Sequence, residues 1–238
     1  AFSEVREAFL SNFRERNELG AACTVYHRGE KVVDLWGGYR DKARRKPWQK
    51  DTMVIVFSTS KGVAAMTIAV AHARGLIDFD QPVAQYWPEF AQHGKERITV
   101  RQLLSHQAGL SAIDKRLLPS TLVDLDAVAT ILAQQKPAWE PGTRHGYHSA
   151  TLGWFEGELI RRVDPQHRSL GQFFQEEIAR PLGIEFYFGL PRGLSESRLA
   201  ELDEPRMIES LLNLDKSPWP LVKRVLLPWT LTARSLFL

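Results

Sequence analysis

The chain has very little cysteine and no long apolar run, and both absences narrow its class. Cys23 is the only cysteine among 238 residues, so an internal disulfide framework is excluded and nothing argues for an oxidising compartment. Cys23 lies in an apolar stretch, where we expect a core residue rather than a nucleophile. No run of about eighteen apolar residues is present, so we expect no membrane-spanning helix. The N-terminus lacks the basic-then-apolar layout of a signal peptide, and we therefore favour a cytoplasmic location.

Several signatures of other functions are also missing from the sequence. The seven histidines form no H-E-x-x-H pair and have no cysteine partners, so we expect neither a zinc site nor a cofactor. There is no G-x-S-x-G elbow of an α/β-hydrolase and no glycine loop that would hold a phosphate. The formal net charge is only +3, and the one basic cluster, residues 40–46, lacks interleaved aromatics. We interpret that cluster as a solvated loop and expect no nucleic-acid partner.

The order of expected elements indicates an α+β protein. A hydrophobic content of 44% and a charged content of 25% are ordinary for a globular domain. An amphipathic helix over 3–18 carries Val5, Phe9 and Phe13 four residues apart and precedes two strands that read as a hairpin. The middle of the chain is helical, which predicts an antiparallel sheet with a helical subdomain. The expected strands are 21–27 and 32–39. The later helices are 63–74, 98–106 with Thr99 as its cap, 122–135 with an apolar stripe of Val123, Val128, Ile131 and Leu132, 150–162, and 169–180, which Pro181-Leu182-Gly183 ends. Residues 139–143 predict a turn.

The stretch Phe57-Ser58-Thr59-Ser60-Lys61-Gly62 opens an alanine-rich helix that Gly75 ends. Ser58 would lie near the helix N-terminus, where unpaired N–H groups favour a developing negative charge. Lys61 follows one turn later on the same face, so a hydroxyl and an amine that can take its proton would be within reach of each other. The alternative is that Ser58 is only a helix cap and Lys61 only a solvated residue.

Stretches further along the chain weigh against that alternative, because they follow Phe57–Gly62 in a specific order. They are Gly75–Val83, Ile98–Leu110, and Pro141-Gly142-Thr143 followed by Tyr147-His148-Ser149. With the S-x-x-K stretch, they resemble the serine β-lactamase and penicillin-binding-protein superfamily, and within it the class C-like branch that includes the family VIII carboxylesterases. The resemblance covers roughly residues 1–190 and implies a β-lactamase/transpeptidase-like fold.

The resemblance implies roles for three residues. Ser58 would be the nucleophile that forms an acyl-enzyme, and its backbone N–H would form half of an oxyanion hole. Lys61 would share or accept the serine proton. Tyr147 would act as the base in acylation and as the proton donor to the leaving group. An unperturbed tyrosine has a pKa near 10, so Lys61 would have to favour the anionic form of Tyr147 or share its proton.

The second motif, Tyr147-His148-Ser149, carries serine where β-lactamases usually carry asparagine. The esterase branch shows this variation, so the resemblance favours ester over lactam hydrolysis. We assign Ser149, His148 and His106 to substrate binding. The predicted function is a serine hydrolase, a carboxylesterase acting on small or short-chain esters. A β-lactamase or D,D-peptidase, and a non-catalytic binding or scaffold protein, are the alternatives.

The family's third motif, Lys-Thr-Gly or its variants, is absent between Ser149 and Leu238. Trp36-Gly37-Gly38 and His27-Arg28-Gly29 imitate it, but they fall in the N-terminal hairpin and so come in the wrong order. We therefore expect an incomplete sheet. The chain would be a fragment, or a second chain or homo-oligomer would complete the sheet, or an exposed edge would leave little activity.

The expected organisation is a single β-lactamase-like domain over 1–238, truncated at its C-terminus. Residues 1–56 would hold the N-terminal helix and hairpin, and 57–190 the mostly helical part with the motifs. Residues 191–238 would cover the pocket or contact a partner. A membrane-surface helix is the alternative for the last segment, although Pro218, Pro220 and Pro228 would interrupt it.

Overall fold

The computed structural model describes residues 2–115, 117–202, 227 and 230–236. They fall into two compact units, one within Ala1–Phe57 and Leu190–Asn213 and the other within Ser58–Gly189 and Leu214–Leu238. None of the helices in the described ranges has the length and apolar character needed to cross a membrane. The strands are β1 (Gly20–His27) and β2 (Glu30–Gly38), and the helices are α1 (Ser3–Glu15), α2 (Thr59–Ala73), α3 (Val83–Tyr86), α4 (Val100–Leu104), α5 (Pro119–Leu122), α6 (Leu125–Gln134), α7 (Thr151–Val163), α8 (Leu170–Phe174), α9 (Arg180–Leu182) and α12 (Leu231–Leu236).

The first unit is the predicted hairpin with its N-terminal helix. Strands β1 and β2 pair antiparallel, with Gly20 opposite Gly38. Arg28 and Gly29 both have positive φ, 52° and 83°, which is the backbone of the two-residue turn that best fits the twist of a hairpin. Helix α1 packs on β2, where Gly38 leaves room for the ring of Phe13, which a Cβ at that position would meet at 2.7 Å. The unit therefore has the expected antiparallel pairing in a two-stranded sheet.

Part of the segment 191–238 joins this first unit. The backbone N–H of Met53 donates to the carbonyl of Arg198 at 2.7 Å, and Ala200 donates to the carbonyl of Met53 at 2.8 Å. These bonds form a short parallel bridge. The rest of the expected covering segment, including Pro218, Pro220 and Pro228, lies outside the described residues.

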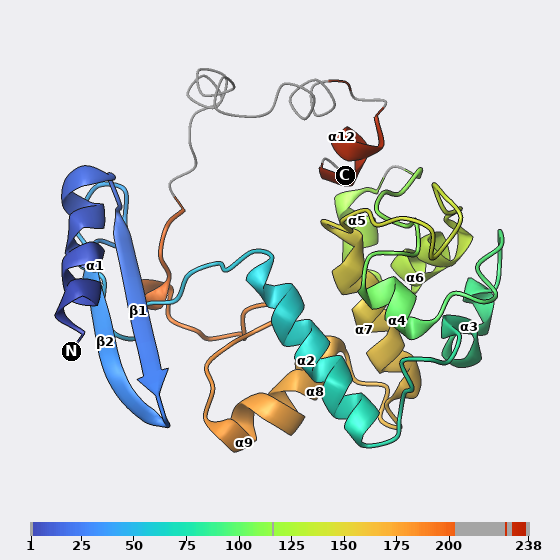
Figure 1. Ribbon diagram of the computed structural model, residues 1–238, viewed down its shortest axis with the longest axis horizontal. Coiled ribbons are helices and arrows are strands. Elements are labelled where there is room, and N and C mark those ends of the chain that lie inside the picture. Colours follow the sequence, from blue (N-terminus) through green and yellow to red (C-terminus); the bar gives the residue numbers. More distant parts are fainter. Residues whose placement is uncertain (1, 116, 203–226, 228–229, 237–238) are drawn as a thin grey trace. The chain divides into compact units, whose positions relative to one another are not determined.

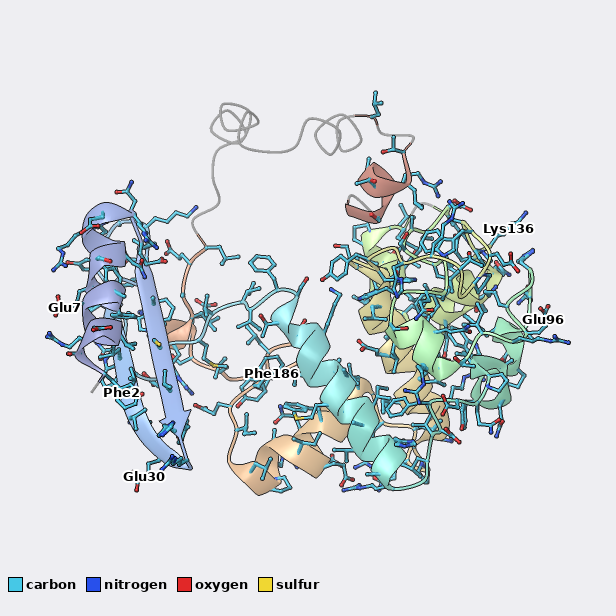
Figure 2. All side chains as sticks on the ribbon, in the orientation of Figure 1. Phe2, Glu7, Glu30, Glu96, Lys136 and Phe186 are labelled. Atoms are coloured by element: carbon cyan, nitrogen blue, oxygen red, sulfur yellow. The ribbon has the colours of Figure 1, made fainter. Side chains whose placement is uncertain are left out.

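The second unit is helical and holds the larger apolar core. Helix α2 packs against α7 and α8, as Figure 1 shows, and buries Ile68 completely. Phe155 of α7 is also fully buried in this core. Phe186, labelled in Figure 2, makes edge-on contacts with Phe174 of α8 and with Phe188. The small side chains of Ala64 and Ala71 let neighbouring helices approach α2 closely, so the body of this helix is held by close packing.

The predicted helix over 122–135 is shorter than expected, and one of its residues was wrongly placed. Val128, Ile131 and Leu132 lie in the core, but Val123 is 83% exposed and does not belong to the buried stripe. The reason is Asp124, whose carboxylate accepts from the first backbone N–H groups of α6. This cap starts the helix at Leu125, so Val123 precedes it and faces solvent.

Two other helices end or change form earlier than the sequence indicated. The N-terminal helix was predicted over 3–18 but stops at Glu15, and Asn17 takes a left-handed backbone with φ of 57°. The helix predicted over 169–180 begins after a Ser169–Gln172 capping box, but it passes into a π-helical turn at Gln175–Ala179. Gly183, with φ of 64°, ends this region, as the Pro-Leu-Gly sequence predicted.

Candidate active site

Ser58 is the residue immediately before α2. Within the described residues its hydroxyl caps no backbone N–H group of the helix, so the capping alternative does not describe its side chain. Ser58 is exposed, and Phe57 before it has a left-handed φ of 43°. The first N–H groups of a helix have no intrahelical partners, and the positive end of the helix dipole lies there. An exposed hydroxyl is thus placed where negative charge on a reacting oxygen would be stabilised.

Lys61 lies one helical turn after Ser58 and links the start of α2 to the loop before α7. Its Nζ is 3.3 Å from Oγ of Ser58, within hydrogen-bonding reach. The same Nζ donates to the main-chain carbonyl oxygen of Ser149 at 2.6 Å. The serine of the second motif therefore contacts Lys61 through its backbone.

Tyr147 completes a group of three polar side chains at the start of α2. Its hydrogen bond with the Ser58 side chain lowers the pKa of the phenol, and Lys61 lowers it further by hydrogen bonding and by charge, against the opposing effect of burial. Nζ of Lys61 lies 5.1 Å from the centre of the tyrosine ring. Because the ring is 49% exposed, solvent and small molecules can reach it. The structure thus brings Ser58, Lys61 and Tyr147 together. These contacts lower the pKa of the tyrosine and so favour its phenolate form.

Two segments cross to hold the loop that carries Tyr147. Gly142 donates to the carbonyl of Gln107 at 3.1 Å, and Ala138 donates to the carbonyl of Gly109 at 2.8 Å. A side chain at Gly146 would clash with the ring of Trp139, which its Cβ would meet at 2.2 Å. The sequence predicts a turn at 139–143. The structure shows that Gly142 and Ala138, in and before this turn, also hydrogen bond with the backbone of residues 107–109.

The rings of His106 and His148 pack against each other, and that of His106 also packs against Tyr147. Their rings stack with centroids 5.2 Å apart, and the ring of Tyr147 lies 4.9 Å from that of His106. His148 is completely buried, and burial lowers its pKa to about 4. The pKa of His106 is also lowered, by burial and by the charge of Lys61. The side chain of His148 is fully buried, and its Nε2 accepts from the backbone N–H of Leu110 at 3.1 Å.

Glu156 of α7 is a further polar residue near the group, and the sequence analysis did not single it out. Its side chain is 1% exposed, and Oε2 has no hydrogen-bond partner among the described residues. Burial raises its pKa to about 8, and the charge of Lys61 acts in the opposite direction. The signal that could have revealed it is a glutamate among the apolar residues of a helix: it directly follows Phe155, which is fully buried.

Known proteins with similar sequences and structures identify the family. The model of the Beta-lactamase family matches residues 7–205. Esterase/beta-lactamase LipL of Mycobacterium tuberculosis is 38% identical over 208 residues, which cover 87% of this chain and 48% of LipL. Esterase EstB of Burkholderia gladioli is 32% identical over 193 residues, covering 74% of this chain and 48% of EstB. The chain spans about half the length of these relatives.

Solved structures agree with this assignment. The crystal structure of a family VIII carboxylesterase superposes with a TM-score of 0.81 and 44% identity, over 91% of this chain and 59% of that one. A penicillin-binding protein homologue from Caulobacter crescentus gives the same TM-score and identity, over 86% of this chain and 54% of that one. The expected β-lactamase/transpeptidase-like fold is therefore confirmed, and the chain belongs to the beta-lactamase family.

Proposed function

We propose that this protein is a serine hydrolase that forms an acyl-enzyme on Ser58 and acts as a carboxylesterase on small or short-chain esters. The proposal rests on the contacts that the Ser58 hydroxyl makes. Instead of capping α2, it faces the amine of Lys61 and hydrogen bonds with Tyr147. A hydroxyl beside a phenol that can ionise and accept its proton, and beside a cationic amine, at an exposed helix start, has the arrangement needed for nucleophilic catalysis.

In the first half of the reaction, Oγ of Ser58 attacks the ester carbonyl carbon as its proton moves to the phenolate oxygen of Tyr147. The carbonyl π electrons move to oxygen, and the backbone N–H of Ser58 at the start of α2 stabilises this oxyanion. The lowered pKa of Tyr147 increases the fraction of phenolate available at neutral pH. Lys61 supplies the positive charge that favours the phenolate.

In the second half, the bond between carbonyl carbon and alkoxide oxygen breaks, and the leaving alkoxide takes the proton from Tyr147. The acyl group remains on Ser58. A water molecule then gives its proton to the Tyr147 phenolate and attacks the acyl carbon. Oγ of Ser58 leaves with the proton held by Tyr147, which releases a carboxylic acid and restores the starting state. No metal or cofactor enters this sequence.

Esters are favoured over lactams by the second motif and by the relatives. The motif has Ser149 in place of asparagine, and a hydroxyl differs from an amide in reach and in donor pattern. LipL, EstB and the family VIII carboxylesterase carry esterase names. A β-lactamase or D,D-peptidase is the second candidate, because LipL is also named a beta-lactamase and an Escherichia coli beta-lactamase is 29% identical over 165 residues.

A fluorophosphonate probe tests the mechanism, and two chromogenic substrates test the specificity. We expect the probe to label the wild-type protein and not the Ser58→Ala variant. Equal labelling of both, or no labelling of the wild type, would overturn the proposal and favour a non-catalytic binding protein. A nitrophenyl ester of a short acid should turn over faster than a chromogenic cephalosporin. The reverse order would replace the esterase with the β-lactamase.

A further inference from the structure

One residue, His106, holds both neighbours of Tyr147. The backbone N–H of Gly146 donates to the main-chain carbonyl of His106 at 3.0 Å. The backbone N–H of His148 donates to Nδ1 of the His106 ring, also at 3.0 Å. Tyr147 lies between these two anchored residues, so the direction of its side chain depends on where His106 sits. His106 itself has a left-handed φ of 63°, which fixes its backbone in an uncommon conformation.

The hydrogen bonds of the two imidazole rings determine where their protons lie. The backbone N–H of Leu110 can only donate, and it points at Nε2 of His148 at 3.1 Å, so that nitrogen must be an acceptor. A neutral His148 then carries its proton on Nδ1. That Nδ1 is 3.0 Å from Nδ1 of His106, to which it donates. His106 Nδ1 is therefore an acceptor, and its proton lies on Nε2.

A positive charge on either ring would break this arrangement. A proton on Nε2 of His148 would face the N–H of Leu110, and a proton on Nδ1 of His106 would face two donors. The titratable groups around the pair are Lys61 from α2, with His145 and Tyr147 from the same loop. The charges of Lys61 and His145 act with burial to keep His106 neutral. Among the described residues, no carboxylate contributes to the pKa shift of either ring.

We infer that His106 and His148 form a neutral pair with fixed tautomers that positions Tyr147 and, through the backbone of Ser149, Lys61. The second part follows from chain continuity: Ser149 directly follows the buried His148, and its carbonyl accepts from Lys61 at 2.6 Å. The pair therefore positions both polar groups beside Ser58, which are Tyr147 and Lys61. This positioning role rests on the proposed function for its catalytic meaning, but the tautomers are a property of the fold alone.

Histidine tautomers can be read directly by ¹⁵N-detected NMR of the imidazole nitrogens in the intact protein at pH 7. We expect His148 in the Nδ1–H form and His106 in the Nε2–H form. A protonated His148, or His148 with its proton on Nε2, would overturn the inference. This measurement does not depend on activity, so it separates failure of the pair from failure of the hydrolase proposal, which the probe labelling of the wild type decides.

Matched variants test the positioning role. His106→Leu removes the acceptor, whereas Asn in His106→Asn offers an amide oxygen close to the position of Nδ1. His27→Leu removes an exposed imidazole from the first unit, whereas the pair belongs to the second, and is the control. We expect His106→Leu to lower the rate of Ser58 labelling about 10²-fold, because small misplacements of reacting groups have effects of that size. His106→Asn should recover most of this rate, and His27→Leu should retain it.

The pH profile and the tyrosine signal distinguish positioning from a general loss of structure. Acid should slow wild-type labelling in step with protonation of the pair, and His106→Asn should lack the part of that decline due to His106. The ¹³Cζ resonance of Tyr147, assigned with Tyr147→Phe, should titrate at higher pH in His106→Leu than in the wild type. If His106→Leu matched His27→Leu in both labelling rate and Tyr147 titration, the inference would be wrong.

Discussion

Nζ of Lys61 is closer to the main-chain carbonyl oxygen of Ser149, at 2.6 Å, than to Oγ of Ser58, at 3.3 Å. Every residue has a backbone carbonyl, so the side chain of Ser149 is not needed to hold the lysine. We expect Ser149→Ala to keep the rate constant of fluorophosphonate labelling within about threefold of wild type, which is less than ~1 kcal/mol.

Lys61→Met is the contrasting variant. It keeps the length of the side chain but removes the amine, and we expect it to reduce labelling of Ser58 on the order of 10³-fold or more. Substrate kinetics on a nitrophenyl ester complete the comparison. A rise in KM for Ser149→Ala with unchanged labelling would show that the hydroxyl contacts substrate, as the sequence predicted. A large fall in labelling for Ser149→Ala would contradict the backbone role.

Leu132 and Val123 should differ sharply in their effect on stability. Leu132 is completely buried in the core of the second unit, whereas Val123 is 83% exposed before the start of α6. Leu132→Ala should lower the free energy of unfolding by about 3 kcal/mol, because it removes buried methyl groups and leaves a cavity. Val123→Ala should change it by less than about 0.5 kcal/mol. Urea unfolding of both variants measures the difference. Equal losses in the free energy of unfolding would show that Val123 packs in the core with Leu132.

Asp164 and Arg168 form a buried ion pair, and the stability that this pair contributes should depend on pH. Asp164 is 1% exposed and accepts from Nε of Arg168 at 2.8 Å and from Nη2 at 2.9 Å. These hydrogen bonds lower the pKa of the carboxyl to about 2. The stabilisation is therefore present above the ordinary pKa of 3.8 and is lost as the pH falls from there towards 2.

At pH 7 we expect Asp164→Asn to lower the free energy of unfolding by about 2 kcal/mol, since it weakens charge-assisted hydrogen bonds to Arg168, which keeps Glu176 and Glu177 as partners at 2.8 Å. The difference from wild type should shrink as the pH approaches 2. Asp126→Asn is the matched control, because Asp126 pairs with Arg161 but its side chain is 83% exposed. Its effect should stay below about 1 kcal/mol. Equal losses in the two variants would show that burial of Asp164 does not matter.

Glu156 should make the protein less stable at alkaline pH. Burial raises its pKa from 4.5 to about 8, so between these values the unfolded chain releases a proton that the folded chain keeps. The free energy of unfolding therefore falls as the pH rises through this window, by at most about 5 kcal/mol. Glu156→Gln removes the titration and keeps the shape.

Chemical denaturation between pH 5 and pH 9 tests this expectation. Glu156→Gln should gain stability relative to wild type as the pH rises, and the exposed Glu30→Gln should show no such trend. If the difference between Glu156→Gln and wild type stayed constant across this range, the carboxyl would not be titrating with a raised pKa.

The residues that the sequence predicted well are those whose contacts are local or carried by an ordered motif. Ser58 and Lys61 are one helical turn apart, so periodicity alone places them on one face, and Gly75 marks the end of their helix. The capping box of Thr99 and Gln102 was visible as a cap before α4. The antiparallel hairpin followed from apolar runs on either side of a turn.

What the sequence could not supply depends on contacts between segments far apart. The burial of His148 and the bond from Lys61 to the carbonyl of Ser149 arise only when two loops cross and α7 packs on α2. Nothing in the order of residues distinguishes the backbone of Ser149 from its hydroxyl. Val123 was misplaced for a local reason, since the apolar pattern outweighed the capping preference of Asp124.

Lys61 and Ser149 are 88 residues apart in the chain, and the packing of α7 against α2 brings them together. Contacts between such distant segments form only after a large loop has closed, which is slow compared with helix formation. A reagent that reacts with Ser58 only when Lys61 and Tyr147 are in place would therefore report the moment at which the helical unit finishes folding. The rate at which Ser58 becomes reactive during refolding would then measure the folding rate of the helical unit.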